Sequence, residues 1–184
     1  MRAVVVIEPE APENLGFIAR LAENFEFDIR VVNPKFNLKE ARKTANNAQE
    51  KLRNARIFDS VEASVKDLDF VVGTKPRKGI VSREFNFRDN TSIMLGRESS
   101  GLTKEELGLC DAVVHIDASY DSLNLSHAAS VLMYEAYDSK GENAESSRLE
   151  FIEDKYGENL RNLLGRGSPT DEELDRVIGE LNQI

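Results

Sequence analysis

Three polar segments hold the residues whose types could support chemistry. They are "NLGFIAR" (Asn14–Arg20), "MLGRESSGLT" (Met94–Thr103) and "SLNLSHAAS" (Ser122–Ser130). Glycine lets a ligand approach the backbone closely, and serine or asparagine before a helix can bond either the helix end or a ligand. Taken singly, each segment also has a plainer explanation: a surface arginine, a strand-to-helix turn and a helix cap.

Several familiar chemistries find no support. The glycine segment has neither the GxGxxG pattern nor the Lys-Ser/Thr pair of a P-loop. With one cysteine (Cys110) and two histidines (His115 and His127), a zinc site is not expected, and no Ser-His-Asp or Cys-His arrangement can be read. His127 falls in the first turn of a helix and His115 in an apolar strand, so we interpret both as structural. We therefore expect no metal.

Length and composition indicate one globular domain with a small appendage. The chain has 184 residues, of which 40% are hydrophobic and 31% charged. No apolar run reaches the roughly 18 residues that a membrane span needs. A single cysteine fits a reducing compartment, so we expect a cytoplasmic protein without a membrane segment.

Charge is distributed unevenly along the chain. The net charge is −9, yet residues 1–100 sum to +2 and residues 101–184 to −11. An acidic protein is a poor default candidate for nucleic-acid binding. The basic stretch "TKPRKGIVSR", residues 74–83, could nevertheless form a local patch for a polyanion, the alternative being a solvated loop.

The elements that position these segments alternate between strand and helix patterns. Strands are predicted at residues 3–9, 28–34, 56–60, 69–74, 91–96 and 112–118, and helices at 12–25, 38–55, 61–68, 103–110 and 125–140. The second helix is expected to break near Asn46-Asn47, and Thr103 with Glu106 forms a capping box. Such alternation predicts an α/β sheet with helices on both faces, with ligands at the loops after Thr74, Gly96 and Ala118.

The character of the chain changes after residue 140. Residues 141–147 are small, polar and acidic, which is typical of a linker, and residues 148–184 form a polar helical extension. The extension is too short for a core of its own. We therefore divide the chain into a main domain (1–140), a linker and the extension.

Taken together and in order, the segments Asn14–Arg20, Met94–Thr103 and His115–Glu135 resemble the three motifs of the SPOUT methyltransferases, and more narrowly the SpoU/TrmH class. The resemblance covers about residues 1–140. Within the class, "VVGTKPRK" and the tail are most similar to the TrmJ subfamily of tRNA ribose methyltransferases.

The resemblance implies a fold and a ligand. The fold would be a mostly parallel sheet with helices on both faces and a C-terminal trefoil knot. The chain would be a cytoplasmic homodimer that methylates a tRNA 2′-hydroxyl at nucleotide 32, using S-adenosyl-L-methionine. The resemblance assigns cofactor binding to Thr74, Lys75, Pro76, Gly96, Ile116, Ser122, Leu123 and Leu125.

The resemblance also assigns catalytic roles, with Arg20 activating the hydroxyl. Because arginine stays protonated, electrostatic positioning of a phosphate or of the developing alkoxide is easier to defend than proton removal. Asn14, Glu98, Ser122 and Asn124 would orient Arg20 and the ribose. RNA phosphates would be bound by Arg20, Lys75, Arg77 and Arg97.

Three alternatives remain open. The enzyme could act at another tRNA position or on rRNA, because motifs do not fix the substrate. A SPOUT-like RNA-binding protein without catalysis would share the fold. A flavodoxin-like nucleotide-binding domain would be unknotted and would not prefer S-adenosylmethionine.

Overall fold

A computed structural model describes residues 2–120 and 123–138 of the chain. Within this part, seven strands form one sheet in the order β3-β2-β1-β6-β4-β7-β5, and every neighbouring pair is parallel. The strands are β1 (Ala3–Ile7), β2 (Asp28–Val32), β3 (Arg56–Phe58), β4 (Phe70–Thr74), β5 (Ile80–Val81), β6 (Thr91–Leu95) and β7 (Ala112–His115). The predicted α/β architecture with a parallel sheet is confirmed.

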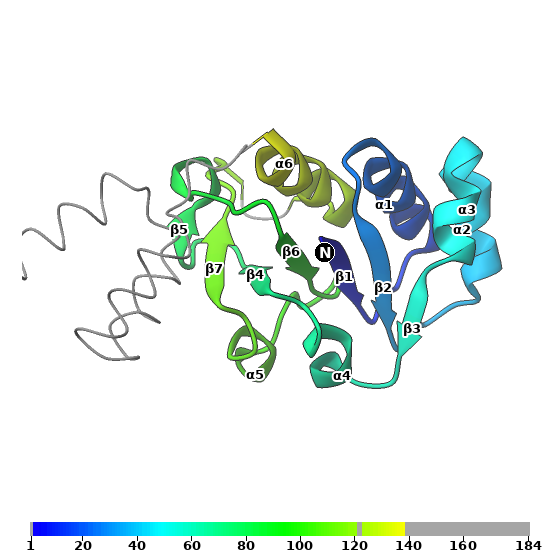
Figure 1. Cartoon of the computed structure of the whole chain (residues 1–184), viewed down its shortest axis with the longest axis horizontal. Coiled ribbons are helices and arrows are strands. Elements are labelled where there is room, and N and C mark those ends of the chain that lie inside the picture. The colour runs from blue at the N-terminus through cyan, green and yellow to red at the C-terminus, as the bar shows by residue number, and fades with distance from the viewer. Residues whose placement is uncertain (1, 121–122, 139–184) are drawn as a thin grey trace, which may run out of the picture.

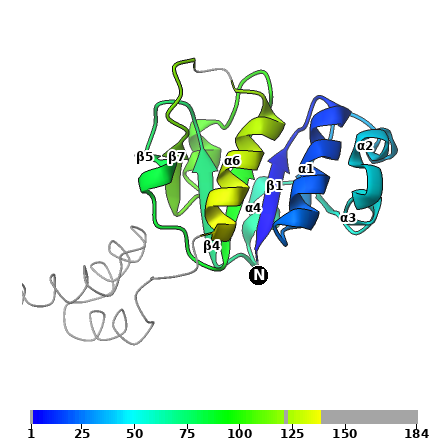
Figure 2. The same ribbon diagram turned by 90° about the horizontal axis from the view of Figure 1, so that it is seen from above.

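Helices cover both faces of the sheet (Figure 1). One face carries α1 (Pro12–Asn24), α2 (Leu38–Ala45), α3 (Gln49–Arg53) and α6 (Leu125–Asp138); the other carries α4 (Val61–Val65) and α5 (Lys104–Leu107). Short 3₁₀ turns, η1 (Asn46–Ala48) and η2 (Ser82–Glu84), complete the described elements. Figure 2 shows α1 and α6 side by side over the centre of the sheet.

The core explains why the first strand is a continuous apolar run. All five residues of β1 are buried, because the strand lies near the middle of the sheet with helices on both sides. Val4 and Val6 join the cluster under α1 and α6, whereas Val5 and Ile7 face the side of α4 and α5. A strand of this kind cannot show polar alternation.

The second predicted helix and the edge strand β5 can be compared with their sequence patterns. The expected break in the second helix is confirmed, since α2 ends at Ala45 and Asn46 adopts a left-handed backbone (φ 52°). The two-residue strand β5 was not predicted, because Ile80 and Val81 are too few to make a pattern.

The order of the strands places β7 between β4 and β5, although β7 comes later in the sequence. The chain then continues into α6, which packs beside α1. The predicted trefoil knot, the linker at 141–147 and the extension at 148–184 involve residues outside the described part and stay predictions. No helix in residues 2–120 and 123–138 is long and apolar enough to cross a membrane.

Candidate active site

One pocket lies at the carboxyl edge of the sheet. Since β4 pairs with both β6 and β7 in parallel, their carboxyl ends lie side by side and the loops that follow them converge. The pocket has a volume of about 930 Å³, within the usual range for a small-molecule site. Its lining comes from residues 74–77, 96–101, 115–120 and 123–125, together with Ala128.

The pocket gathers most of the residues predicted for the cofactor. Seven of the eight line it: Thr74, Lys75, Pro76, Gly96, Ile116, Leu123 and Leu125. The eighth, Ser122, lies outside the described residues. The three strand-end loops chosen from the sequence therefore surround a single cavity.

The loop after β6 is closed on itself. Arg97 and Gly101 exchange backbone hydrogen bonds of 3.3 and 2.9 Å, which folds residues 97–101 into a tight turn. A Cβ on Gly96 would lie 2.2 Å from the carbonyl carbon of Gly101. Only glycine fits at position 96 without moving the backbone of the turn.

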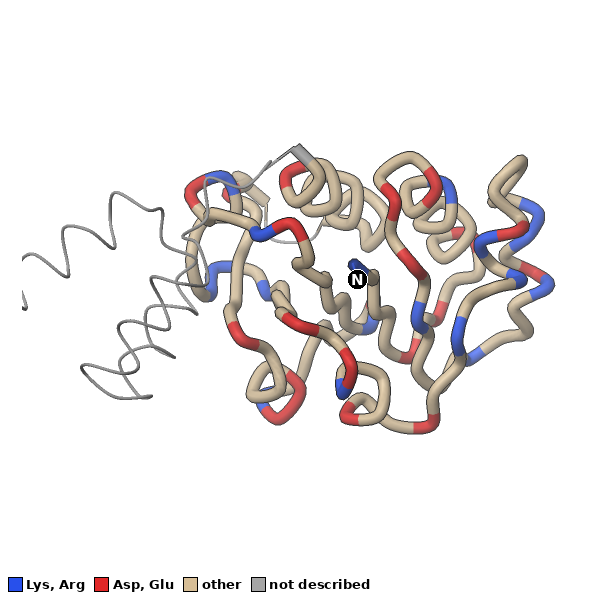
Figure 3. The backbone as a smooth tube through the Cα atoms, viewed as in Figure 1, with Lys and Arg blue, Asp and Glu red and all other residues tan. Residues whose placement is uncertain are grey.

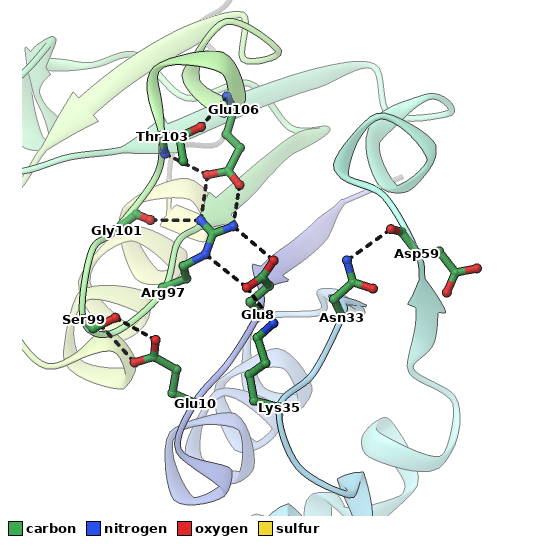
Figure 4. Close-up of polar contacts among 10 residues, drawn as sticks. All are labelled: Glu8, Glu10, Asn33, Lys35, Asp59, Arg97, Ser99, Gly101, Thr103 and Glu106. Carbon is green, nitrogen blue, oxygen red and sulfur yellow. Dashed lines mark hydrogen bonds and ion pairs between the residues drawn. The ribbon is translucent and has the colours of Figure 1, made fainter.

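Arg97 is bound by two carboxylates of the same chain (Figure 4). Its guanidinium donates to both oxygens of Glu106, over 2.9 and 3.0 Å, and its Nε donates to Glu8 over 3.3 Å. These bonds raise the pKa of Arg97. Although burial would raise the pKa of Glu106, the hydrogen bonds from Arg97 and from the Thr103 N–H lower it overall. Arg97 therefore joins the pocket loop to α5. Its predicted contact with an RNA phosphate stays a prediction.

Glu8 extends this network toward β2. Its carboxylate also pairs with Lys35 over 2.8 Å, and the hydrogen bonds from Lys35 and Arg97 lower its pKa (Figure 4). Glu8 has a left-handed backbone (φ 43°) at the end of β1, an uncommon conformation for a residue other than glycine. Its carboxylate lies between two cations, Lys35 and Arg97.

Glu98 binds the segment that leads into α1. Its carboxylate accepts hydrogen bonds from the backbone N–H groups of Glu10 (2.9 Å) and Ala11 (3.2 Å) and from the side-chain amide of Asn14 (3.0 Å). Ser99 in turn donates through its hydroxyl to Glu10 over 2.7 Å. The first and second predicted motifs thus form one hydrogen-bonded unit. The predicted role of Asn14 and Glu98 in orienting Arg20 and the ribose stays a prediction.

Asn124 caps α6. Its side-chain oxygen accepts from the N–H and from the hydroxyl of Ser126, at 2.9 and 2.7 Å. Asn124 also lines the pocket, together with Leu123 and Leu125. Asn124 therefore has both of the roles that the sequence allows for this segment: it caps a helix and it lines a cavity.

The predicted basic residues are placed differently from one another. Lys75 is partly buried and donates through Nζ to the carbonyl of Leu102 over 2.7 Å, which ties the loop after β4 to the loop after β6. Arg77 is exposed on the pocket rim. Arg20 is exposed on α1 and does not line the pocket, and neither does Asn14.

The structure adds pocket residues that sequence reasoning missed. His115, Asp117, Ser119 and Tyr120 line the cavity, and the Nδ1 atom of His115 is buried without a hydrogen-bond partner among the described residues. The signal was available, because all four come at or directly after the end of β7, one of the chosen strand ends. The apolar strand around His115 favours a structural role, and this pattern hides its place at the pocket.

Comparison with known proteins assigns the fold and the motifs to a family. The profile of the SpoU rRNA methylase family matches residues 1–134. The chain belongs to the SpoU methylase family. This confirms the resemblance to the SpoU/TrmH class and makes the chain an RNA methyltransferase.

Individual members of the SpoU family agree with this assignment. The tRNA (cytidine-2′-O-)-methyltransferase TrmJ of Methanocaldococcus jannaschii is 34% identical over 161 residues, which are 78% of this chain and 70% of that protein. A probable methylase family protein of Haemophilus influenzae has a TM-score of 0.71 at 26% identity, covering 98% of this chain and 94% of the other. The fold is also shared by AviRb of Streptomyces viridochromogenes, solved with AdoMet (TM-score 0.65, 24% identity, 73% and 56% coverage).

Among the residues that the structure describes, no group of three or more histidine, cysteine or acidic side chains could hold a metal ion.

Proposed function

We propose that the chain is an S-adenosyl-L-methionine-dependent tRNA 2′-O-ribose methyltransferase that modifies nucleotide 32 of the anticodon loop, and that it works as a homodimer in the cytoplasm. The observation that carries the proposal is the pocket at the carboxyl edge, which seven predicted cofactor residues line. The TrmJ name of a relative 34% identical supports tRNA and the 2′-hydroxyl as the target.

The pocket suits the proposed cofactor in size and in chemistry. Leu123, Leu125 and Ile116 offer apolar contacts to an adenine ring, while the backbone around Gly96 can be approached closely. Backbone groups of residues 74–76 and 123–125 would hold the polar edges of the cofactor. When bound, the cofactor supplies a methyl group on a positively charged sulfur.

The residues of the chain would then position and activate the ribose. A 2′-hydroxyl is a weak nucleophile and must lose its proton as it attacks. We assign to Arg20 the stabilisation of the developing alkoxide or of the adjoining phosphate, since a guanidinium does not give up its proton near neutral pH. Asn14, Glu98, Ser122 and Asn124 would orient these groups, and Lys75, Arg77 and Arg97 would contact phosphates.

The position of Arg20 supports a site shared between two subunits. Arg20 comes six residues after Asn14, about 9 Å further along α1 at 1.5 Å per residue, and it is absent from the pocket lining. An arginine so placed serves the pocket of a second copy better than its own. The proposed homodimer would bring Arg20 of one subunit to the pocket of the other.

Exposed aromatic side chains offer a surface for that dimer. Phe17 on α1 and Tyr134 and Tyr137 on α6 are 42%, 55% and 37% exposed, and both tyrosines pack against Phe25 near the end of α1. Large apolar side chains gathered on adjacent helices are typical of an interface. Tyr134→Glu should give a monomer by light scattering, whereas Ile57→Glu on β3, which also replaces an exposed apolar residue, should leave the dimer intact. If Tyr134→Glu and Ile57→Glu are both dimers, the dimer does not form through this surface.

The same proposal includes the trefoil knot and the division of the chain. The insertion of β7 between β4 and β5, followed by α6 beside α1, is compatible with a threaded C-terminal segment. We propose residues 1–140 as the catalytic domain, 141–147 as a linker and 148–184 as a helical extension.

Methyl transfer to RNA tests the activity directly. The purified protein is incubated with labelled S-adenosylmethionine and unmodified bulk tRNA, and the labelled nucleotide is located by nuclease digestion and mass spectrometry. A single 2′-O-methylated nucleotide at position 32 is the expected result. A label elsewhere in tRNA, or only in rRNA, would keep the enzyme class and change the substrate. Cofactor binding without transfer to any RNA would favour a binding protein.

A further inference from the structure

The part of the molecule that includes α2, α3 and the edge strand β3 carries a concentration of positive charge. Residues 35–56, which form α2, η1, α3 and the start of β3, contain seven lysines and arginines but only two glutamates, in a chain whose net charge is −9. Figure 3 shows these basic positions gathered over α2, α3 and β3. We call this set the basic end: Lys35, Lys39, Arg42, Lys43, Lys51, Arg53 and Arg56.

Four members of the basic end are paired with carboxylates of the same chain. Lys35 pairs with Glu8, Lys51 with Glu23, Arg53 with Glu50 and Arg56 with Asp67, at distances between 2.8 and 3.9 Å. These cations are largely neutralised by their own neighbours. They contribute to the local field but are not free to bind a new anion closely.

The three cations of α2 are different. Among the described residues, Lys39, Arg42 and Lys43 have no carboxylate or carbonyl partner. Lys39 and Lys43 are exposed and four residues apart, so they project from the same side of the helix. Arg42 is partly buried, and its Nε has no acceptor within residues 2–120 and 123–138. The exposed amides Asn46 and Asn47 follow directly.

We propose that the α2 surface formed by Lys39, Arg42 and Lys43 binds the phosphate backbone of the RNA substrate, away from the pocket where the methyl group is transferred. Lysine, arginine and asparagine are the side chains that commonly contact phosphates. At physiological ionic strength charges are screened beyond about 8 Å, so a local cluster can attract RNA although the whole chain is acidic. The inference rests on the proposed function, since it assumes an RNA substrate.

The α2 surface is separate from the pocket, since none of Lys39, Arg42 and Lys43 lines it. The surface belongs to α2, which packs against α1, whereas the pocket is formed by the loops after β4, β6 and β7 and by the start of α6. A folded polynucleotide such as tRNA is large enough to contact both places at once. The surface should therefore affect the binding of whole tRNA and leave cofactor binding unchanged.

A plainer explanation has its own prediction. Arg42 and Lys43 lie in the last turn of α2, where positive charge stabilises the end of a helix. That role would appear as a change in the melting temperature and would leave RNA affinity unaltered. Measuring the melting temperature together with tRNA affinity separates the two roles.

The test compares Lys39→Glu/Lys43→Glu with Lys66→Glu/Lys104→Glu. The control pair is also exposed and changes the net charge equally, but it lies at α4 and α5 on the opposite face of the sheet. Binding of fluorescent tRNA is measured at several salt concentrations, along with KM for tRNA, cofactor affinity and melting temperature. Lys39→Gln/Lys43→Gln serves as a milder variant if the charge reversal disturbs folding.

We expect Lys39→Glu/Lys43→Glu to weaken tRNA binding at least about tenfold. The slope of log affinity against log salt concentration should fall in magnitude by about 1 to 2, as for one or two lost phosphate contacts. The control should stay within about twofold of the unaltered protein. Equal affinities of the two variants for tRNA would overturn the inference, and so would a lower melting temperature with unchanged tRNA affinity. If the unaltered protein neither binds nor methylates tRNA, the proposed function fails instead.

Discussion

The side-chain amide of Asn14 donates a hydrogen bond of 3.0 Å to the carboxylate of Glu98, across 84 residues of sequence. Asn14 is buried in the first turn of α1, and Glu98 stands in the loop after β6 that lines the pocket. The same carboxylate accepts hydrogen bonds from the backbone N–H groups of Glu10 and Ala11, the two residues that lead into α1. The position of the pocket loop and the start of α1 are thereby coupled.

Replacing Glu98 by alanine should therefore destabilise the protein. The change leaves a buried amide and two backbone donors without their acceptor, so we expect the free energy of unfolding to fall by about 1–3 kcal/mol. Urea denaturation measures it, and Glu105→Ala, an exposed acid of α5, is the control. A cycle with Asn14→Ala should give a coupling energy of about 0.5–1.5 kcal/mol. Additive effects would mean that the two residues act independently.

Gly96→Ala should abolish cofactor binding, because its Cβ would overlap the backbone of Gly101 and open the turn. Gly101→Ala is the matched control. At Gly101 a Cβ meets no atom within 4 Å, and only the positive φ of +67° is strained, at a cost of about 1 kcal/mol. Calorimetric titration with S-adenosylmethionine should detect no binding to Gly96→Ala and retained binding to Gly101→Ala. Equal losses would contradict this account of the loop.

Local patterns made the elements and the pocket predictable. Apolar runs such as Val4–Ile7 and the capping box of Thr103 with Glu106 depend on neighbours in sequence, and both are confirmed. Strand-end loops such as the one after Thr74 are predictable ligand sites, because parallel strands direct their carboxyl ends to one edge of the sheet.

Contacts between distant segments were not predictable. The partners of Arg97 illustrate this, because Glu8 is 89 residues away and only the order of β1 beside β6 brings it close. Sequence alone predicts that an arginine in a glycine-rich loop is available to a ligand. The insertion of β7 beside β5 is likewise a property of the whole sheet, and two residues of β5 carry no readable pattern.

Arg20→Ala should abolish methyl transfer and leave cofactor binding near that of the unaltered protein, since Arg20 does not line the pocket. Single-turnover transfer from labelled cofactor and calorimetric titration measure the two properties. Arg20→Lys keeps the charge but not the planar guanidinium, and partial activity there would indicate an electrostatic role. Lost cofactor affinity in a folded, dimeric Arg20→Ala variant would contradict the assignment.

Cys110, the single cysteine of the chain, should be unreactive in the folded protein. Burial raises the pKa of its thiol to about 12, and the nearby carboxylates of Asp111 and Glu106 add to the shift. Because only the thiolate is nucleophilic, a disulfide reagent at pH 8 should modify the native protein at least about a hundredfold more slowly than the unfolded chain. Rapid native labelling would show that the region around Met94 and Cys110 opens readily.

Stability at low pH should depend on the pair of Arg30 and Asp67. Arg30 is fully buried and forms an ion pair with Asp67, and the hydrogen bond from Arg30 lowers the pKa of that carboxyl from 3.8 to about 2. A lowered folded-state pKa stabilises the protein above the unfolded value, and this stabilisation is lost as the pH falls from about 4 to about 2.

Asp67→Asn should therefore lower the urea midpoint at pH 7, because the buried guanidinium of Arg30 loses its charged partner. The difference from the unaltered protein should shrink as the pH falls from about 4 to about 2, where Asp67 itself becomes protonated. Asp59→Asn, which changes an exposed carboxylate, should behave like the unaltered protein at each pH. A difference that is constant down to pH 2 would mean that the ion pair does not contribute to the acid dependence.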